Sequence, residues 1–129
     1  MADDLAAWLT QIWDEQEKAA RAAFSNQADP EEGWGEDGRA VTPHVGVIHE
    51  DVQRAHVVAW HPGVVLDRIA ADRLILARFE AVRNAPMGPD AFANGVGMAR
   101  FAELEAVVKH LALPHADRPG YREEWRVAE

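Results

Sequence analysis

Apolar residues recur every three or four positions in three separate stretches of this chain, and this spacing constrains the fold more than any other feature. In residues 3–24 they form one face of an amphipathic helix that should end near Ser25–Asn26. A second helix is predicted to begin at Pro62, a residue suited to the first helical turn. The third stretch covers roughly residues 97–112; Asp90 could cap an earlier start, but Gly95 and Gly97 disfavour it. The predicted buried face of the second helix consists of Val65, Ile69, Leu76, Phe79 and Val82.

Segments rich in helix breakers separate these stretches. The acidic segment 27–38 is predicted to be a loop and the segment 84–96 a linker, because both contain proline and glycine. Between them, β-branched residues near 39–48 allow one short β-hairpin, and residues 51–60 are typical of a short helix. The predicted fold is therefore mainly α, with three long helices plus a short helix in a small bundle, within a single domain that covers residues 1–129.

The C-terminal segment 113–129 is rich in aromatic residues and turn formers. Leu113-Pro114 should end the third helix, because a residue before proline avoids α geometry. Tyr121 and Trp125 follow in a segment that allows one helical turn, where residues four apart face the same side. We expect this segment to pack on the bundle as a structural clasp, with a recognition motif as the alternative.

The net charge of −9 is unevenly distributed along the chain. Residues 1–51 hold 12 of the 22 acids and three of the 13 bases, whereas residues 52–129 hold 10 of each. Direct nucleic-acid binding is not expected, since phosphate contacts need a basic surface. The excess of acids suits a basic protein partner, or mimicry of nucleic acid. The absence of cysteine and of any leader or membrane-spanning pattern leads us to expect a cytoplasmic protein without membrane contact.

Six histidines are the residues most suited to metal chemistry. However, His49-Glu50 is not followed by a second histidine at the spacing of a zinc-enzyme helix. A metal site would have to combine separate segments, with His56, His61 and His115 as the candidates. No nucleophile context and no nucleotide-binding motif is recognisable. We therefore predict no catalytic residue, no cofactor and no metal, with a histidine-dependent metal-binding protein or enzyme as the alternative.

Three of the five tryptophans are candidates for partner binding. Trp8 and Trp13 lie five positions apart on the first helix, so they point in different directions and one could be an exposed anchor. Trp34 stands between two glycines in the acidic loop. The alternative for all three is that the indole ring packs into the core.

Three segments of the sequence resemble a family of small actinobacterial and phage-associated proteins of unknown function. These segments are the opening "DLAAWLTQIWDEQEKAARAA", the middle "HVVAWHPGVVLDRIAADRLIL" and the closing "LALPHADRPGYREEW". The closing signature of that family carries an aromatic residue more often at the position of His115, which weakens a metal role for this histidine. The resemblance implies a phage or mobile-element context and no particular mechanism.

Together, these patterns predict a non-enzymatic protein that binds another macromolecule. The motivation is the lack of a catalytic constellation, the acidic first two fifths of the chain and the number of tryptophans. Homo-oligomer formation through an aromatic face is also open.

Overall fold

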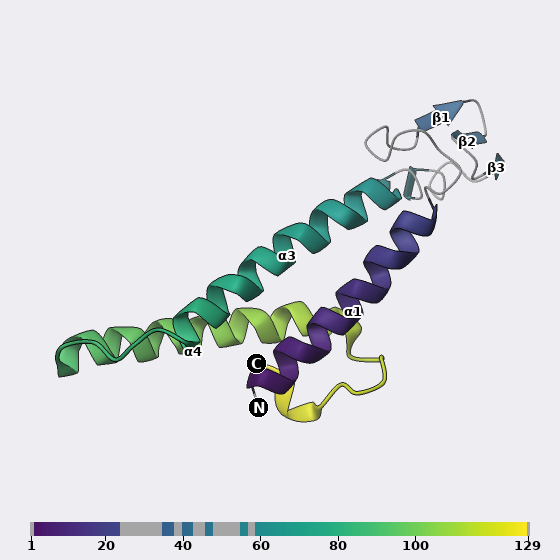
Figure 1. Ribbon diagram of the computed structural model, residues 1–129. Helices are drawn as coiled ribbons and strands as arrows, with labels where there is room; N and C mark the ends of the chain where they lie inside the picture. Colours follow the sequence, from purple (N-terminus) through teal and green to yellow (C-terminus); the bar gives the residue numbers. More distant parts are fainter. Residues whose placement is uncertain are drawn as a thin grey trace. The chain divides into compact units, whose positions relative to one another are not determined.

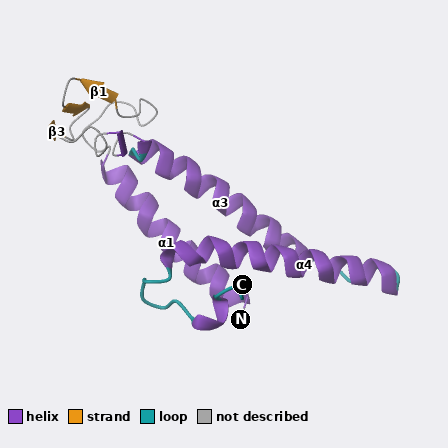
Figure 2. Cartoon of the chain, turned by 180° about the vertical axis from the view of Figure 1, so that it is seen from behind, coloured by secondary structure: helices purple, strands orange, loops and turns teal. Residues whose placement is uncertain are grey.

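The computed structural model describes residues 2–23, 35–37, 40–42, 46–47, 55–56 and 59–128. The chain divides into two compact units, and the helices carry most of the described residues in both (Figures 1 and 2). The prediction of a mainly helical fold is confirmed. Within the ranges just given, no helix has the length and apolar content that a membrane span requires. That the chain forms a single domain stays a prediction.

The first unit contains residues 1–12 and 71–129. It combines the first half of α1 (Ala2–Ala23), the second half of α3 (Pro62–Arg83), α4 (Ala91–Ala112) and the tail, which holds the 3₁₀ turns η1 (Leu113–His115) and η2 (Glu123–Trp125). Buried apolar side chains come from all of these elements except η1. The buried residues of this unit are Leu5, Ala6, Leu9, Ile12, Leu76, Phe79, Val108, Ala112 and Trp125.

Each of these larger side chains contributes on the order of 1.5–3 kcal/mol by leaving water. Phe79 of α3 adds a stacked contact with Phe101 of α4, with ring centroids 5.3 Å apart. Because Phe79 also belongs to the predicted apolar stripe of its helix, the three-to-four spacing did identify the buried side of α3. The core of the first unit is therefore the place where the helix faces meet.

The second unit contains residues 13–70. Its three short strands, β1 (Gly35–Asp37), β2 (Ala40–Thr42) and β3 (Gly46–Val47), form an antiparallel sheet in the order β1-β2-β3. In this sheet Glu36 pairs with Val41, and Ala40 pairs with Val47. The hairpin of β2 and β3 lies in the segment where the sequence predicts one, whereas β1 was not predicted.

The predicted short helix over 51–60 lies partly outside the described residues. Within it, Ala55, His56 and Ala59 are helical, and the backbone N–H of Trp60 donates to the carbonyl of His56. The acidic loop predicted over 27–38 is described only at Gly35–Asp37, which is strand β1.

Helix α4 begins at Ala91, six residues before the predicted start, so the linker covers 84–90 and the predicted linker 84–96 is wrong. The reason is a strong N-cap: the carboxylate of Asp90 accepts a hydrogen bond from the backbone N–H of Ala93 at 2.8 Å. Asn94 Oδ1 also accepts from the N–H of Gly88 at 2.7 Å. A Cβ at Gly88 would lie 2.5 Å from the Cβ of Ala93, so only glycine fits this close approach. These contacts outweigh the low helix propensity of Gly95 and Gly97.

We predict that Asp90→Ala lowers the free energy of unfolding by about 1 kcal/mol and frays the first turn of α4, because the N–H of Ala93 loses its acceptor. Urea denaturation followed by circular dichroism measures the effect. Asp67→Ala, which removes an exposed carboxylate from the body of α3, is the control and should change the stability by less than about 0.5 kcal/mol. Equal effects of the two variants would show that the cap does not hold this helix start.

Candidate functional site

The C-terminal tail returns to the first turns of α1 and packs on Trp8. The indole ring of Trp8 lies 5.7 Å from the ring centroid of Tyr121 and 5.3 Å from that of Trp125. Tyr121 and Trp125 meet edge to face at 5.8 Å, an arrangement that aromatic quadrupoles favour. The Nε1–H of Trp8 donates to the carbonyl of Pro119 at 3.0 Å. Trp8, proposed from the sequence as a partner anchor, is thus half-buried against the tail.

Two further features fix this clasp of Trp8, Tyr121 and Trp125. Gly120 has φ +89°, and a Cβ on it would lie 2.9 Å from Nε1 of Trp8. Arg122 donates to the carboxylate of Asp4 at 2.9 Å, and its guanidinium lies over the Trp125 ring, 5.5 Å from the centroid. The ion pair is exposed and contributes less than about 1 kcal/mol. The ring contacts and the glycine turn therefore carry most of the attachment.

We predict opposite effects for two Gly→Ala substitutions. Gly120→Ala should lower the free energy of unfolding by about 1–3 kcal/mol, because alanine resists a positive φ and its Cβ meets the indole of Trp8. Gly95→Ala, in α4 with open space around it, should raise the stability by roughly 0.5–1 kcal/mol. Thermal and urea denaturation of both variants measures the difference. A neutral Gly120→Ala variant would contradict the tight approach of the tail to α1.

Of the three tryptophans outside the clasp, the structure describes two. Trp13 is fully buried, so it serves as a core residue and not as an exposed anchor. Trp34 lies outside the described residues. Trp60, which sequence reasoning did not select, is about half exposed; its ring lies 6.3 Å from the ring of His56, and Arg68 Cζ lies 5.7 Å from its centroid. The available signal was its position just before the Pro62 helix start, outside the periodic stripe.

The three histidines proposed as metal candidates are held by separate elements. His56 is exposed in the second unit, and His61 Nδ1 accepts from the backbone N–H of Gly63 at 3.0 Å, which caps the start of α3. His115 belongs to η1 in the first unit. Among the residues that the structure describes, no three histidine or carboxylate side chains come together in a group that could hold a metal ion.

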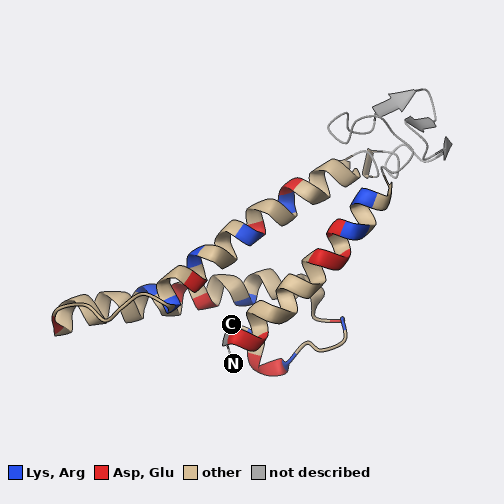
Figure 3. Cartoon of the chain, in the orientation of Figure 1, with Lys and Arg blue, Asp and Glu red and all other residues tan. Residues whose placement is uncertain are grey.

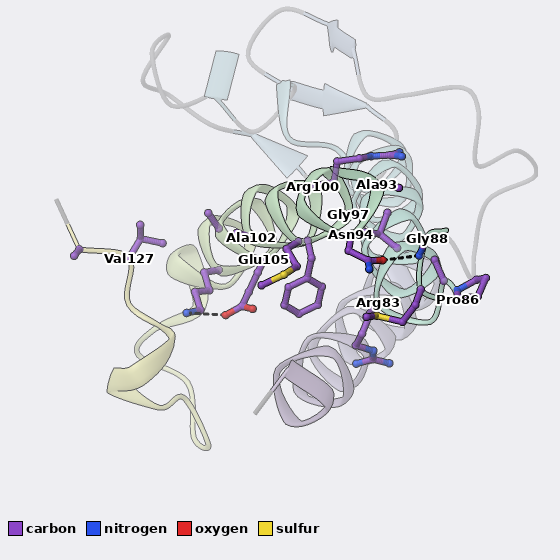
Figure 4. A pocket seen from close by; sticks show the side chains of 18 of the residues that line it. Arg83, Pro86, Gly88, Ala93, Asn94, Gly97, Arg100, Ala102, Glu105 and Val127 are labelled. Carbon is purple, nitrogen blue, oxygen red and sulfur yellow. Dashed lines mark hydrogen bonds and ion pairs between the residues drawn. The ribbon is translucent and has the colours of Figure 1, made fainter. Parts of the chain in front are cut away.

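A partly open groove of about 870 Å³ lies in the first unit. Its walls are the end of α3, the turn 84–90, one side of α4 and the last tail residues (Figure 4). Apolar side chains dominate the lining. They are Val82, Ala85, Pro86, Met87, Ala93, Met98, Phe101, Ala102, Ala106, Val127 and Ala128.

Charged groups in the lining are mostly basic. The lining contains four bases, Arg83, Arg100, Lys109 and Arg126, and one acid, Glu105. Lys109 pairs with Glu105 at 3.1 Å, Arg83 pairs with Asp3, and Arg126 pairs with Glu123 at 3.1 Å. Arg100 has no ion-pair partner in the described part of the chain.

The groove has the chemistry of a binding site. Its lining contains no serine, threonine, cysteine, histidine or tyrosine. The one carboxylate, Glu105, is paired with Lys109. Apolar surface with a few fixed charges can hold and orient a ligand. Sequence reasoning missed the groove because three separated segments build it.

The chain belongs to a family of unknown function (DUF6221), whose model matches residues 2–127. No curated protein and no solved structure matches the chain.

Proposed function

We propose that this member of a family without an assigned activity is a non-enzymatic, cytoplasmic protein-binding module. Its groove, between the end of α3 and one side of α4, holds an amphipathic segment of a partner protein. The observation that carries the proposal is the exposure of large apolar side chains there. Met87 and Met98 line the groove and are 83% and 74% exposed. Phe92, in the first turn of α4, is 81% exposed.

Exposed apolar patches of this kind mark interaction surfaces, because a soluble protein gains nothing by keeping them in water. Methionine suits a surface that binds a partner chain, since its unbranched thioether side chain adapts to different shapes. The groove is open along the surface of α4 and its apolar lining extends to Met87 beyond the helix end. This shape suits the apolar face of a helix or an extended segment better than a small enclosed ligand.

The charges around the groove favour an acidic partner segment. Four basic residues and one acid line it. Figure 3 shows that acids are grouped on α1 and that bases are spread along α3. The basic partner expected from the acidic residues 1–51 would bind a different part of the chain and stays a separate prediction. The actinobacterial and phage context, the metal-binding alternative and nucleic-acid mimicry also stay predictions.

We predict that Met98→Glu abolishes capture of the partner from a lysate of the native host, because a carboxylate in the apolar lining must be desolvated on binding. Leu74→Glu is the matched control: Leu74 is 73% exposed on α3 and does not line the groove. Quantitative pull-down with the wild type and both variants measures the effect, and titration calorimetry with the captured protein should show a loss of more than tenfold in affinity.

A second measurement locates the contact. Because the chain has no cysteine, Met87→Cys provides a single thiol for a photoactivatable crosslinker. Crosslinks from position 87 to the captured protein support the groove as the site. Capture that survives Met98→Glu, or crosslinks that form equally from a Leu74→Cys variant, would reject it.

A further inference from the structure

One face of α4 lies opposite most of the groove lining and is exposed along the length of the helix. With about 100° between successive residues of an α-helix, seven side chains fall within a sector of roughly 100°. All seven are exposed. We call this set the outward face; it consists of Phe92, Val96, Ala99, Arg100, Glu103, Val107 and His110.

The composition of the outward face is unusual for a solvated helix surface. Phe92, Val96 and Val107 are 81%, 44% and 40% exposed, whereas the exposed face of an amphipathic helix is normally polar. These apolar residues lie toward the two ends of the helix. Arg100 and Glu103 lie between them, near its middle. In Figure 4 Arg100 and Glu105 point to opposite sides of α4.

Arg100 and Glu103 are not paired with any acid or base in the described ranges. They are three residues apart on one face, about 4.5 Å along the helix axis. A charge pattern of one base and one acid on the same face is self-complementary when a second copy is placed antiparallel to the first. An antiparallel copy with its two-fold axis at the level of residue 101 brings Glu103 of that copy to within about 1.5 Å, along the axis, of Arg100.

The same axis also matches the apolar residues. Val96 comes to the level of Val107 of the second copy, again with an offset of about 1.5 Å along the axis. Phe92 comes level with His110 of the second copy, so two rings meet at each end. Ala99, a small side chain, faces Glu103 near the axis and leaves room for close helix approach. Each of the seven positions thus meets a suitable counterpart.

We propose that the outward face of α4 is a homodimer interface, in which two copies of the chain pack their α4 helices antiparallel about a two-fold axis at residue 101. Two Arg100–Glu103 ion pairs form at the centre, and two Val96–Val107 contacts flank them. A parallel arrangement would bring Arg100 against Arg100 and Glu103 against Glu103, which repel each other. The charge pattern therefore selects the second copy in the antiparallel sense.

The size of the surface sets the expected strength. Helix α4 has 22 residues and is about 33 Å long. A seam between two single helices of that length buries less than the ~800 Å² per partner of a standard stable interface. We therefore expect a concentration-dependent equilibrium, with a dissociation constant in the micromolar range.

Charge reversal tests the proposal. Analytical ultracentrifugation of the wild-type chain over a wide concentration range should show a monomer–dimer equilibrium. Glu103→Arg should weaken the dimer at least tenfold, because Arg100 then faces arginine in both ion pairs. The double variant Arg100→Glu with Glu103→Arg should restore the dimer, and so should an equimolar mixture of the two single variants. Arg78→Glu, an exposed charge reversal on α3, is the control and should leave the equilibrium unchanged.

Disulfide formation tests the direction of packing, since the chain has no other cysteine. A mixture of Val96→Cys and Val107→Cys chains should form a mixed disulfide on mild oxidation. Val96→Cys alone should not, because the two copies of position 96 lie about 15 Å apart along the axis.

Three results would overturn the proposal: a wild-type chain that stays monomeric at millimolar concentration, a dimer that is indifferent to Glu103→Arg, or faster crosslinking of Val96→Cys with itself. Circular dichroism of each variant confirms that the helices are intact. The proposal does not rest on the groove, with which the outward face shares only Arg100. Met98→Glu should leave the dimer unchanged, and Glu103→Arg should leave partner capture unchanged, so failure of either idea is distinguishable from failure of the other.

Discussion

The hydrogen bond from the Trp8 indole to the carbonyl of Pro119 joins residues 111 positions apart in the sequence. Together with the rings of Tyr121 and Trp125, it brings the tail back to the first turns of α1. The residues that follow the clasp, Arg126 to Ala128, then reach the groove and form one of its walls. The shape of the groove therefore depends on the clasp of Trp8, Tyr121 and Trp125, although none of these three residues lines the groove.

Burial along α4 is uneven, and this unevenness leaves apolar surface for the two proposed interfaces. Its C-terminal half contributes Val108 and Ala112 to the core, whereas no residue before Phe101 is buried. The N-terminal half is held by the Asp90 cap and by the Gly88–Asn94 hydrogen bond. These local bonds keep the helix in shape without covering it. Apolar side chains that a core would otherwise enclose are left available on both sides of the helix.

Local patterns were sufficient to predict the helices, and insufficient to predict the site. The three-to-four spacing identified α1 and α3 closely, because apolar residues recur at that spacing in both segments. It failed at the start of α4, where Gly95 and Gly97 suggest a linker and the capping contacts decide otherwise. The spacing of Tyr121 and Trp125 predicted a clasp, but nothing local identified Trp8 as its partner. Neither the groove nor the Trp60–Arg68 contact has a signal within one segment of the sequence.

The two proposed uses of α4 involve different sides of one helix. Of the outward face, only Arg100 also lines the groove, and the apolar groove residues Met98 and Phe101 lie roughly 140–160° around the helix from its centre. Pairing of two copies would therefore leave the apolar lining of each groove open. A symmetric dimer presents two identical grooves, and a partner that offers two copies of the same segment would bind both. The second contact is then intramolecular. Two weakly binding grooves held in one dimer therefore bind such a partner more tightly than a single groove does, provided that the spacing of the two segments matches that of the grooves.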